Sequence, residues 1–140
     1  MSIITITNAE FEAPSILDYS MTCVGNGEVE TCTVEEILPI DNYVNYTGDM
    51  LLTFDLVSVN DLDIQLSKNG GQYTIVNNTT YSFNSSDMLT LKSVKDTTDS
   101  GANPINVSYN MYIYRDSIDQ NENNGLPVLL NTVRINFNSL

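Results

Sequence analysis

Two pairs of carboxylates are the residues of this 140-residue chain whose type and spacing could most readily support catalysis. Glu28 and Glu30, and likewise Asp61 and Asp63, are two residues apart, which places each pair on one face of a strand. Such a pair could supply the acid and the base of a glycosidase, but that reaction also needs a substrate cleft. The chain has no histidine, so the usual general base and the commonest metal ligand are absent. We therefore interpret both pairs as solvated polar edges and expect no enzymatic activity, no catalytic residues and no cofactor.

Two cysteines flank a turn in the first quarter of the chain. If residues 26–27 form a two-residue hairpin turn, Cys23 lies opposite Glu30 and Cys32 lies opposite Met21. That register keeps the two thiols apart, and a reducing cytoplasm would also leave them unbridged. We predict two free, partly buried thiols, and two cysteines without histidine are too few for a zinc site.

An oxygen-rich loop from Asp119 to Gly125 (DQNENNG) resembles the start of a calcium-binding loop. It differs from the EF-hand pattern because its glycine comes one residue late and Leu130 stands where the bidentate glutamate belongs. The composition also suits a polar hairpin loop. We interpret it as such a loop and expect no metal.

Acidic residues dominate the charge of the chain. It has 18 acidic and 5 basic residues, a net charge of −13, and 12 of the acids but none of the bases lie in the first 66 positions. Nucleic acid is excluded as a partner because a phosphate-binding surface needs lysine and arginine, and an anionic membrane is disfavoured for the same reason. The acidic half is either a solvated surface or a docking surface for a basic partner.

We expect neither a membrane span nor a leader in this chain. No stretch is apolar over the roughly 18 residues that a membrane helix requires. The opening residues, MSIITITNAEFEAP, lack the basic region and the apolar run of a signal peptide. We expect the chain to stay in the cytoplasm in which it is made.

A long β-hairpin near the C-terminus organises the predicted fold. Apolar residues alternate with polar ones from Ile105 to Asp116, and the alternation returns after the polar loop from Asp116 to Pro127. We expect Leu129 to lie on the core face of the strand that follows this loop. Tyr112 and Tyr114 make the other face of the first strand aromatic, so we expect something to cover it. The predicted core residues are Tyr109, Met111, Ile113, Val133, Ile135 and Phe137.

Shorter strands and turns fill the rest of the chain. Ser2–Thr7 reads as an N-terminal strand, and Thr33–Leu38, before Pro39, reads as a short helical turn. Asn69 and Gly70 suit the positive φ angles of a type I′ hairpin turn. About ten strands with no sustained helical period predict an antiparallel sandwich or barrel.

From Asp49 onward the chain resembles an immunoglobulin-like or fibronectin-like sandwich. The resemblance lies in the segments LLTFDLVSV, DLDIQLSKNGGQYTIV, YSF, MLTLK, VSYNMYIY and LLNTVRINF. It implies an antiparallel immunoglobulin-like β-sandwich over 49–140. Residues 1–48 would be an extra N-terminal strand, hairpin and helical turn that pack on the sandwich or extend from it. The chain has no tryptophan and no cysteine pair at the sandwich spacing, so it is not an antibody-type domain.

In type and composition the chain is similar to the decoration or head auxiliary proteins of tailed bacteriophages. That similarity implies a non-enzymatic structural protein of the virion, assembled in the host cytoplasm. Its partners would be the major capsid protein or neighbouring copies of itself, so the protein would be oligomeric or particle-bound. The alternative is a carbohydrate-binding or adhesin-type module.

The expected interface residues are apolar or aromatic. The N-terminal segment could pair with the sheet edge of a neighbour, or it could fold back on its own domain as an edge strand. The tyrosines could stack on sugars or line a protein interface, or they could simply be favoured strand residues. The expected interface residues are Ile3, Ile4, Ile6, Phe11, Tyr43 and Tyr46.

Overall fold

The computed structural model describes residues 15–25, 30–55, 62–97, 106–116 and 125–139. Within these ranges the regular structure is nine strands and one short 3-10 turn at Ile40–Asn42. The strands are β1 (Ser15–Gly25), β2 (Glu30–Ile37), β3 (Asp49–Phe54), β4 (Leu62–Lys68), β5 (Thr74–Ile75), β6 (Tyr81–Asn84), β7 (Leu89–Thr97), β8 (Asn106–Arg115) and β9 (Val128–Ser139).

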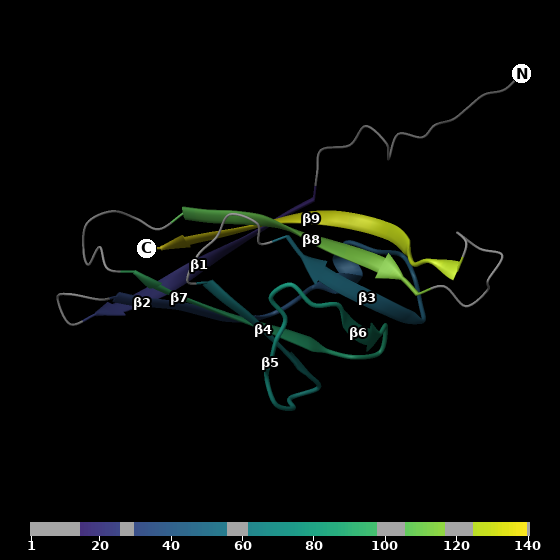
Figure 1. The fold of residues 1–140 in the computed structure, drawn as a ribbon, viewed down its shortest axis with the longest axis horizontal. Helices are drawn as coiled ribbons and strands as arrows, with labels where there is room; N and C mark the ends of the chain where they lie inside the picture. The colour runs from purple at the N-terminus through teal and green to yellow at the C-terminus, as the bar shows by residue number, and fades with distance from the viewer. Residues whose placement is uncertain (1–14, 26–29, 56–61, 98–105, 117–124, 140) are drawn as a thin grey trace, which may run out of the picture.

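All nine strands belong to one mixed sheet, in the order β5-β4-β7-β2-β1-β9-β8-β3-β6. The sheet curls, so that β8 and β9 run along one side of the molecule and β2, β7 and β4 along the other (Figure 1). Every ladder between these described strands is antiparallel except that of β1 with β9. The predicted all-β class with predominantly antiparallel pairing is confirmed, and the parallel ladder of β1 with β9 is the feature that the sequence did not predict.

β1 is shared between the two halves of the curled sheet. Its first part runs parallel to β9, from Ser15 opposite Val133 to Met21 opposite Ser139. Its last four residues pair with β2 instead, ending with Gly25 opposite Glu30. Residues 15–37, which the sequence assigns to a segment outside the sandwich-like part, therefore supply two strands that lie between β7 and β9.

The predicted hairpin of β8 and β9 is confirmed. Tyr109 lies opposite Ile135, and Met111 lies opposite Val133. A bulge between Ile113 and Tyr114 interrupts the register. All six predicted core residues of these strands are buried: Tyr109, Met111, Ile113, Val133, Ile135 and Phe137.

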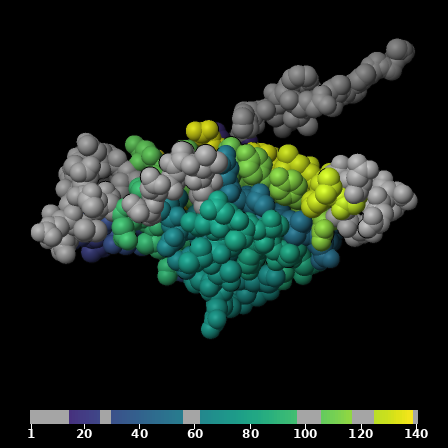
Figure 2. Space-filling model, viewed as in Figure 1, coloured from purple at the N-terminus to yellow at the C-terminus, as the bar shows by residue number. Residues whose placement is uncertain are grey.

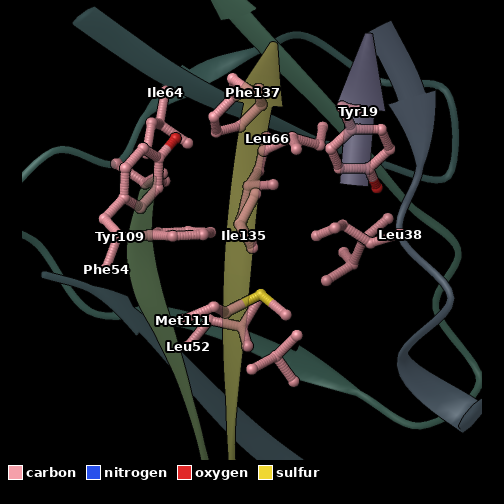
Figure 3. Close-up of a cluster of buried hydrophobic side chains, with 14 of the residues drawn as sticks. Tyr19, Leu38, Leu52, Phe54, Ile64, Leu66, Tyr109, Met111, Ile135 and Phe137 are labelled. Atoms are coloured by element: carbon pink, nitrogen blue, oxygen red, sulfur yellow. The ribbon is translucent and has the colours of Figure 1, made fainter. Parts of the chain in front are cut away.

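Aromatic side chains fill the middle of the core between the two halves. The ring of Phe137 lies 5.8 Å from that of Tyr19 and 5.3 Å from that of Tyr109. Phe54 meets Tyr109 edge-on at 6.2 Å. Figure 3 shows these rings around β9. Offset and edge-on ring pairs at such distances stabilise a core beyond the area that they bury.

The two cysteines form a disulfide, so the prediction of free thiols is wrong. Cys23 lies directly opposite Cys32 in the β1–β2 ladder, with their Cα atoms 4.0 Å apart, and their sulfurs are bonded. The error came from the length of the connection. Residues 26–29 separate the two strands, whereas a two-residue turn at 26–27 would have placed Cys32 opposite Met21.

Of the two predicted local turns, the hairpin turn at Asn69 and Gly70 forms and the helical turn at 33–38 does not. Asn69 and Gly70 have φ angles of 53° and 78°, and the Gly71 N–H donates to the Lys68 carbonyl at 3.0 Å, which confirms the predicted turn. The predicted helical turn at 33–38 is wrong, because β2 continues through Ile37. The helical turn forms further on, at Ile40–Asn42.

Candidate functional site

The predicted interface residues are only partly within the described ranges. Ile3, Ile4, Ile6 and Phe11 lie outside the described residues, as do residues 119–124 of the calcium-like loop. Asp61 and Glu28 also lie outside them, so neither predicted carboxylate pair is described as a pair.

Tyr43 and Tyr46 hold the connection between β2 and β3 against the rest of the molecule. Both are half-buried and pack against the core. The Tyr43 hydroxyl donates to the Ile16 carbonyl at 3.2 Å, and the Tyr46 ring faces the guanidinium of Arg115 at 6.0 Å. A Cβ at residue 48 would lie 2.6 Å from the Tyr46 hydroxyl oxygen, so Gly48 is required for this packing. Tyr43 and Tyr46 therefore have a structural role in this connection.

A row of large side chains crosses the outside of the sheet, on the face away from the core. Leu51 of β3 lies opposite Tyr114 of β8, which lies opposite Leu129 of β9. Residues directly opposite on neighbouring strands share a face and touch. Tyr112 is two residues from Tyr114 on the same face. None of these four is among the described residues that form the core or pack against it. We call Leu51, Tyr112, Tyr114 and Leu129 the outer patch.

The bulge at Ile113 and Tyr114 creates this patch. It moves Leu129 to the outer face, where the side chain is 50% exposed, so the prediction that Leu129 shares the core face is wrong. Leu130 packs against the core instead. Arg134 is exposed on β9 and lies opposite Asn110, two residues from Tyr112, so a basic group borders the patch.

A hollow of about 380 Å³ lies between the β2–β3 connection (38–48) and the turn at 85–88. We call it the acidic hollow. The strands β4 to β6, in teal, fill the middle of the face in Figure 2, and the turn at 85–88 follows them in the chain. The apolar lining is Ile37, Leu38, Pro39, Ile40, Met50, Phe83 and Met88, and the polar lining is Asp41, Asn42, Ser85, Ser86 and Asp87.

Hydrogen bonds fix the two walls of the acidic hollow to each other. The Gly48 N–H donates to the Ser85 hydroxyl at 2.9 Å, and the Ser85 N–H donates to the Gly48 carbonyl at 2.9 Å.

Asp87 accepts hydrogen bonds from the Asn84 N–H and the Asn69 amide, at 2.9 and 2.8 Å. The Asn84 bond, followed by the Asn69 bond, holds the pKa of Asp87 below its ordinary value. Asp87 is therefore an ionised wall of the acidic hollow at neutral pH.

The acidic hollow adjoins a second depression. Asp41, Ser85 and Ser86 line both, and Tyr46 lines the second. The arrangement offers hydroxyl, amide and carboxylate groups beside apolar surface, which can bind a polar ligand but provides no nucleophile paired with a base. The sequence did not identify the acidic hollow, since its walls come from segments about 40 residues apart.

No protein-family model matches the sequence, and no curated protein is similar to it. One solved structure, of the N-terminal domain of PorA, is 13% identical, covers 91% of this chain and 89% of that one, and has a TM-score of 0.48. In the described part of the chain, no helix has the length and apolar character needed to span a membrane.

Proposed function

We propose that this chain is a non-enzymatic structural protein that attaches to a larger particle, in the manner of the capsid decoration proteins of tailed bacteriophages. The outer patch carries this proposal. Two tyrosines and two leucines lie together on a sheet face outside the core, although the chain has a net charge of −13. Tyrosine is enriched, and acidic residues are depleted, at the centres of protein interfaces.

The proposal includes an immunoglobulin-like arrangement of the strands. The supporting features are the adjacent strands β2, β7 and β4 in one half and β9, β8 and β3 in the other. Their inward side chains share one core, and β1 passes from one half to the other. Two facing sheets over a common core are the basis of such sandwiches.

The proposed partner is the major capsid protein, and a neighbouring copy of the chain is the second choice. Such a protein would be assembled in the host cytoplasm and would reside in the virion. With 5 basic residues in 140, nucleic acid is not a proposed partner. The predicted interface residues remain Ile3, Ile4, Ile6, Phe11, Tyr43 and Tyr46.

A sedimentation experiment tests attachment through the outer patch. Purified chain is mixed with capsids assembled without it, the capsids are pelleted, and the bound fraction is measured. We expect the wild type to pellet with the capsids. Tyr112→Ser/Tyr114→Ser should bind at least about tenfold more weakly, because tyrosines at an interface centre commonly contribute over 1 kcal/mol each.

Tyr73→Ser is the matched control, because Tyr73 is also half-buried but belongs to the other half of the sheet, next to β5. It should bind as the wild type does. Equal binding of the double variant and the wild type would exclude the outer patch, and no binding of the wild type would exclude attachment to the capsid.

The acidic hollow favours a second candidate function, carbohydrate binding. Saccharides present hydroxyl groups and apolar C–H faces, which match the mixed lining of the acidic hollow. We expect Asp41→Asn to abolish retention on any glycan that the wild type binds on an array, and Asp63→Asn, an exposed change on β4, to retain it. An array on which the wild type binds no glycan would eliminate this candidate.

A further inference from the structure

Three metal-ligating side chains meet where the β1–β2 hairpin opens into residues 26–29. The two sulfurs of Cys23 and Cys32 and a carboxylate oxygen of Glu30 all lie within 4.8 Å of one another. Glu30 and Cys32 are alternate residues of β2 and so share a face, and Cys23 is directly opposite Cys32 on β1. Cys32 is fully buried, and the other two are half-buried. The two strands thus hold all three groups in a sheltered position.

We propose that, when the disulfide is reduced, Cys23, Cys32 and Glu30 bind a thiophilic divalent cation such as Zn²⁺. Two cysteines alone are too few ligands for zinc, and the structure adds the Glu30 carboxylate as a third. Two thiolates and one carboxylate are a donor set that suits zinc and disfavours calcium and magnesium, which prefer oxygen ligands alone. Three protein ligands leave the fourth tetrahedral position to a water molecule.

The geometry of the hairpin suits this coordination. At zinc–ligand distances of about 2.0–2.3 Å, tetrahedral donors lie roughly 3.5–3.8 Å apart. The two sulfurs are bonded to each other in the disulfide and must move apart to this separation after reduction, whereas the Glu30 carboxylate oxygen already lies within 4.8 Å of both. Side-chain rotation can make this change without any change of strand register.

The conversion of the disulfide form into the metal-bound form is balanced in atoms and electrons. A phosphine reductant donates two electrons to the S–S bond and becomes the phosphine oxide, whose oxygen comes from water, while the sulfurs become two thiols. Binding of the cation then releases two protons from these thiols, and the Glu30 carboxylate binds without losing one. The disulfide and the metal-bound form therefore exclude each other.

Cobalt(II) is the probe for the test, because its thiolate complexes absorb in the near ultraviolet and its tetrahedral complexes absorb strongly in the visible. The full chain is reduced with tris(2-carboxyethyl)phosphine, desalted without oxygen and titrated with cobalt chloride. We expect one equivalent to bind with both absorption signatures, zinc to displace it, and the oxidised protein to bind none.

Two substitutions separate a built site from incidental thiol binding. Glu30→Gln should weaken cobalt binding at least about tenfold, the smallest loss expected even for an outer-sphere partner. Glu36→Gln removes the same charge six residues further along β2 and should bind as the wild type does. Equal affinity of Glu30→Gln and wild type would overturn the three-ligand site.

The near-ultraviolet circular dichroism of the tyrosines shows whether the reduced chain is folded in the same samples. A reduced, folded wild type without cobalt bands would overturn the proposal. Loss of the tyrosine signal on reduction that zinc does not restore would overturn it as well, because the site requires the paired strands.

Discussion

Met111 lies directly opposite Val133 in the ladder of β8 and β9, and neither side chain exposes any surface. The next residue, Tyr112, points to the opposite face and lies in the outer patch. Neighbours in one strand thus have opposite environments, as the two-residue period of a strand requires.

The first prediction compares a charge on each of these two faces. Met111→Asp should unfold the protein, because an unpaired buried carboxylate costs several kcal/mol of a total stability of about 5–15 kcal/mol. Tyr112→Asp should remain folded. Circular dichroism and urea unfolding of both variants measure this, and a folded Met111→Asp protein would mean that the face assignment is reversed.

The second prediction concerns the bond between Cys23 and Cys32. Thiol labelling of the unfolded protein without reductant should find no free thiol, because both cysteines are in the disulfide. Reduction in the absence of metal should lower the free energy of unfolding by about 2–4 kcal/mol. Cys23→Ala/Cys32→Ala is the control, and reductant should not change its stability. Full labelling of the unreduced protein would contradict the disulfide.

The third prediction is an acid dependence due to Asp87. Its pKa is lower in the folded protein than its ordinary value of 3.8, because the Asn84 N–H and the Asn69 amide donate to its carboxylate. Its contribution to stability is therefore present above pH 3.8 and is lost as the pH falls through the lower, folded-state value.

We therefore expect the stability difference between wild type and Asp87→Asn to be largest near neutral pH and to shrink below pH 3.8. Asn69→Ala, which removes one of the two donors, should reduce this pH dependence in part. Urea unfolding at a series of pH values measures it. A difference that is constant from neutral pH down to acid unfolding would rule out this role of Asp87.

The fourth prediction is an alkaline dependence due to Tyr109. Burial raises the pKa of Tyr109 well above its ordinary value of 10, because the core does not solvate a phenolate. The unfolded chain then loses this proton more easily than the folded one. The contribution of the Tyr109 proton to the free energy of unfolding is fully present below pH 10 and is lost as the pH rises towards the folded-state pKa. Between pH 10 and higher pH, the free energy of unfolding of Tyr109→Phe should fall less than that of wild type. Urea unfolding at a series of pH values measures both, and an equal fall in the two proteins would contradict this prediction.

Strand periodicity was sufficient to predict the β8–β9 hairpin and its core. Alternation over long strands fixes which face is buried, and the six core residues followed from it. The turn at Asn69 and Gly70 was also predictable, because few residue pairs tolerate two positive φ angles.

The predictions failed where one or two extra residues change the register, and where strands distant in the sequence pair with each other. Residues 26–29 lengthen the β1–β2 connection and bring Cys23 opposite Cys32. The bulge beside Tyr114 turns Leu129 outward. The parallel pairing of β1 with β9 joins residues more than 110 positions apart, and no local pattern encodes such a contact. The sequence identified Tyr112 and Tyr114 of the outer patch, but Leu129 joins them only through the bulge. The acidic hollow depends on contact between segments about 40 residues apart, so the sequence could not define it.

The parallel ladder of β1 and β9 determines how the protein would bear a mechanical load. Tension between Ser15 and Ser139 pulls the first residue of β1 and the last residue of β9 in opposite directions along the strands. All seven paired positions of this ladder then resist sliding together, instead of opening one at a time. The rate of forced unfolding depends on this barrier more than on equilibrium stability. The fold is thereby suited to staying intact while its two ends are held under strain.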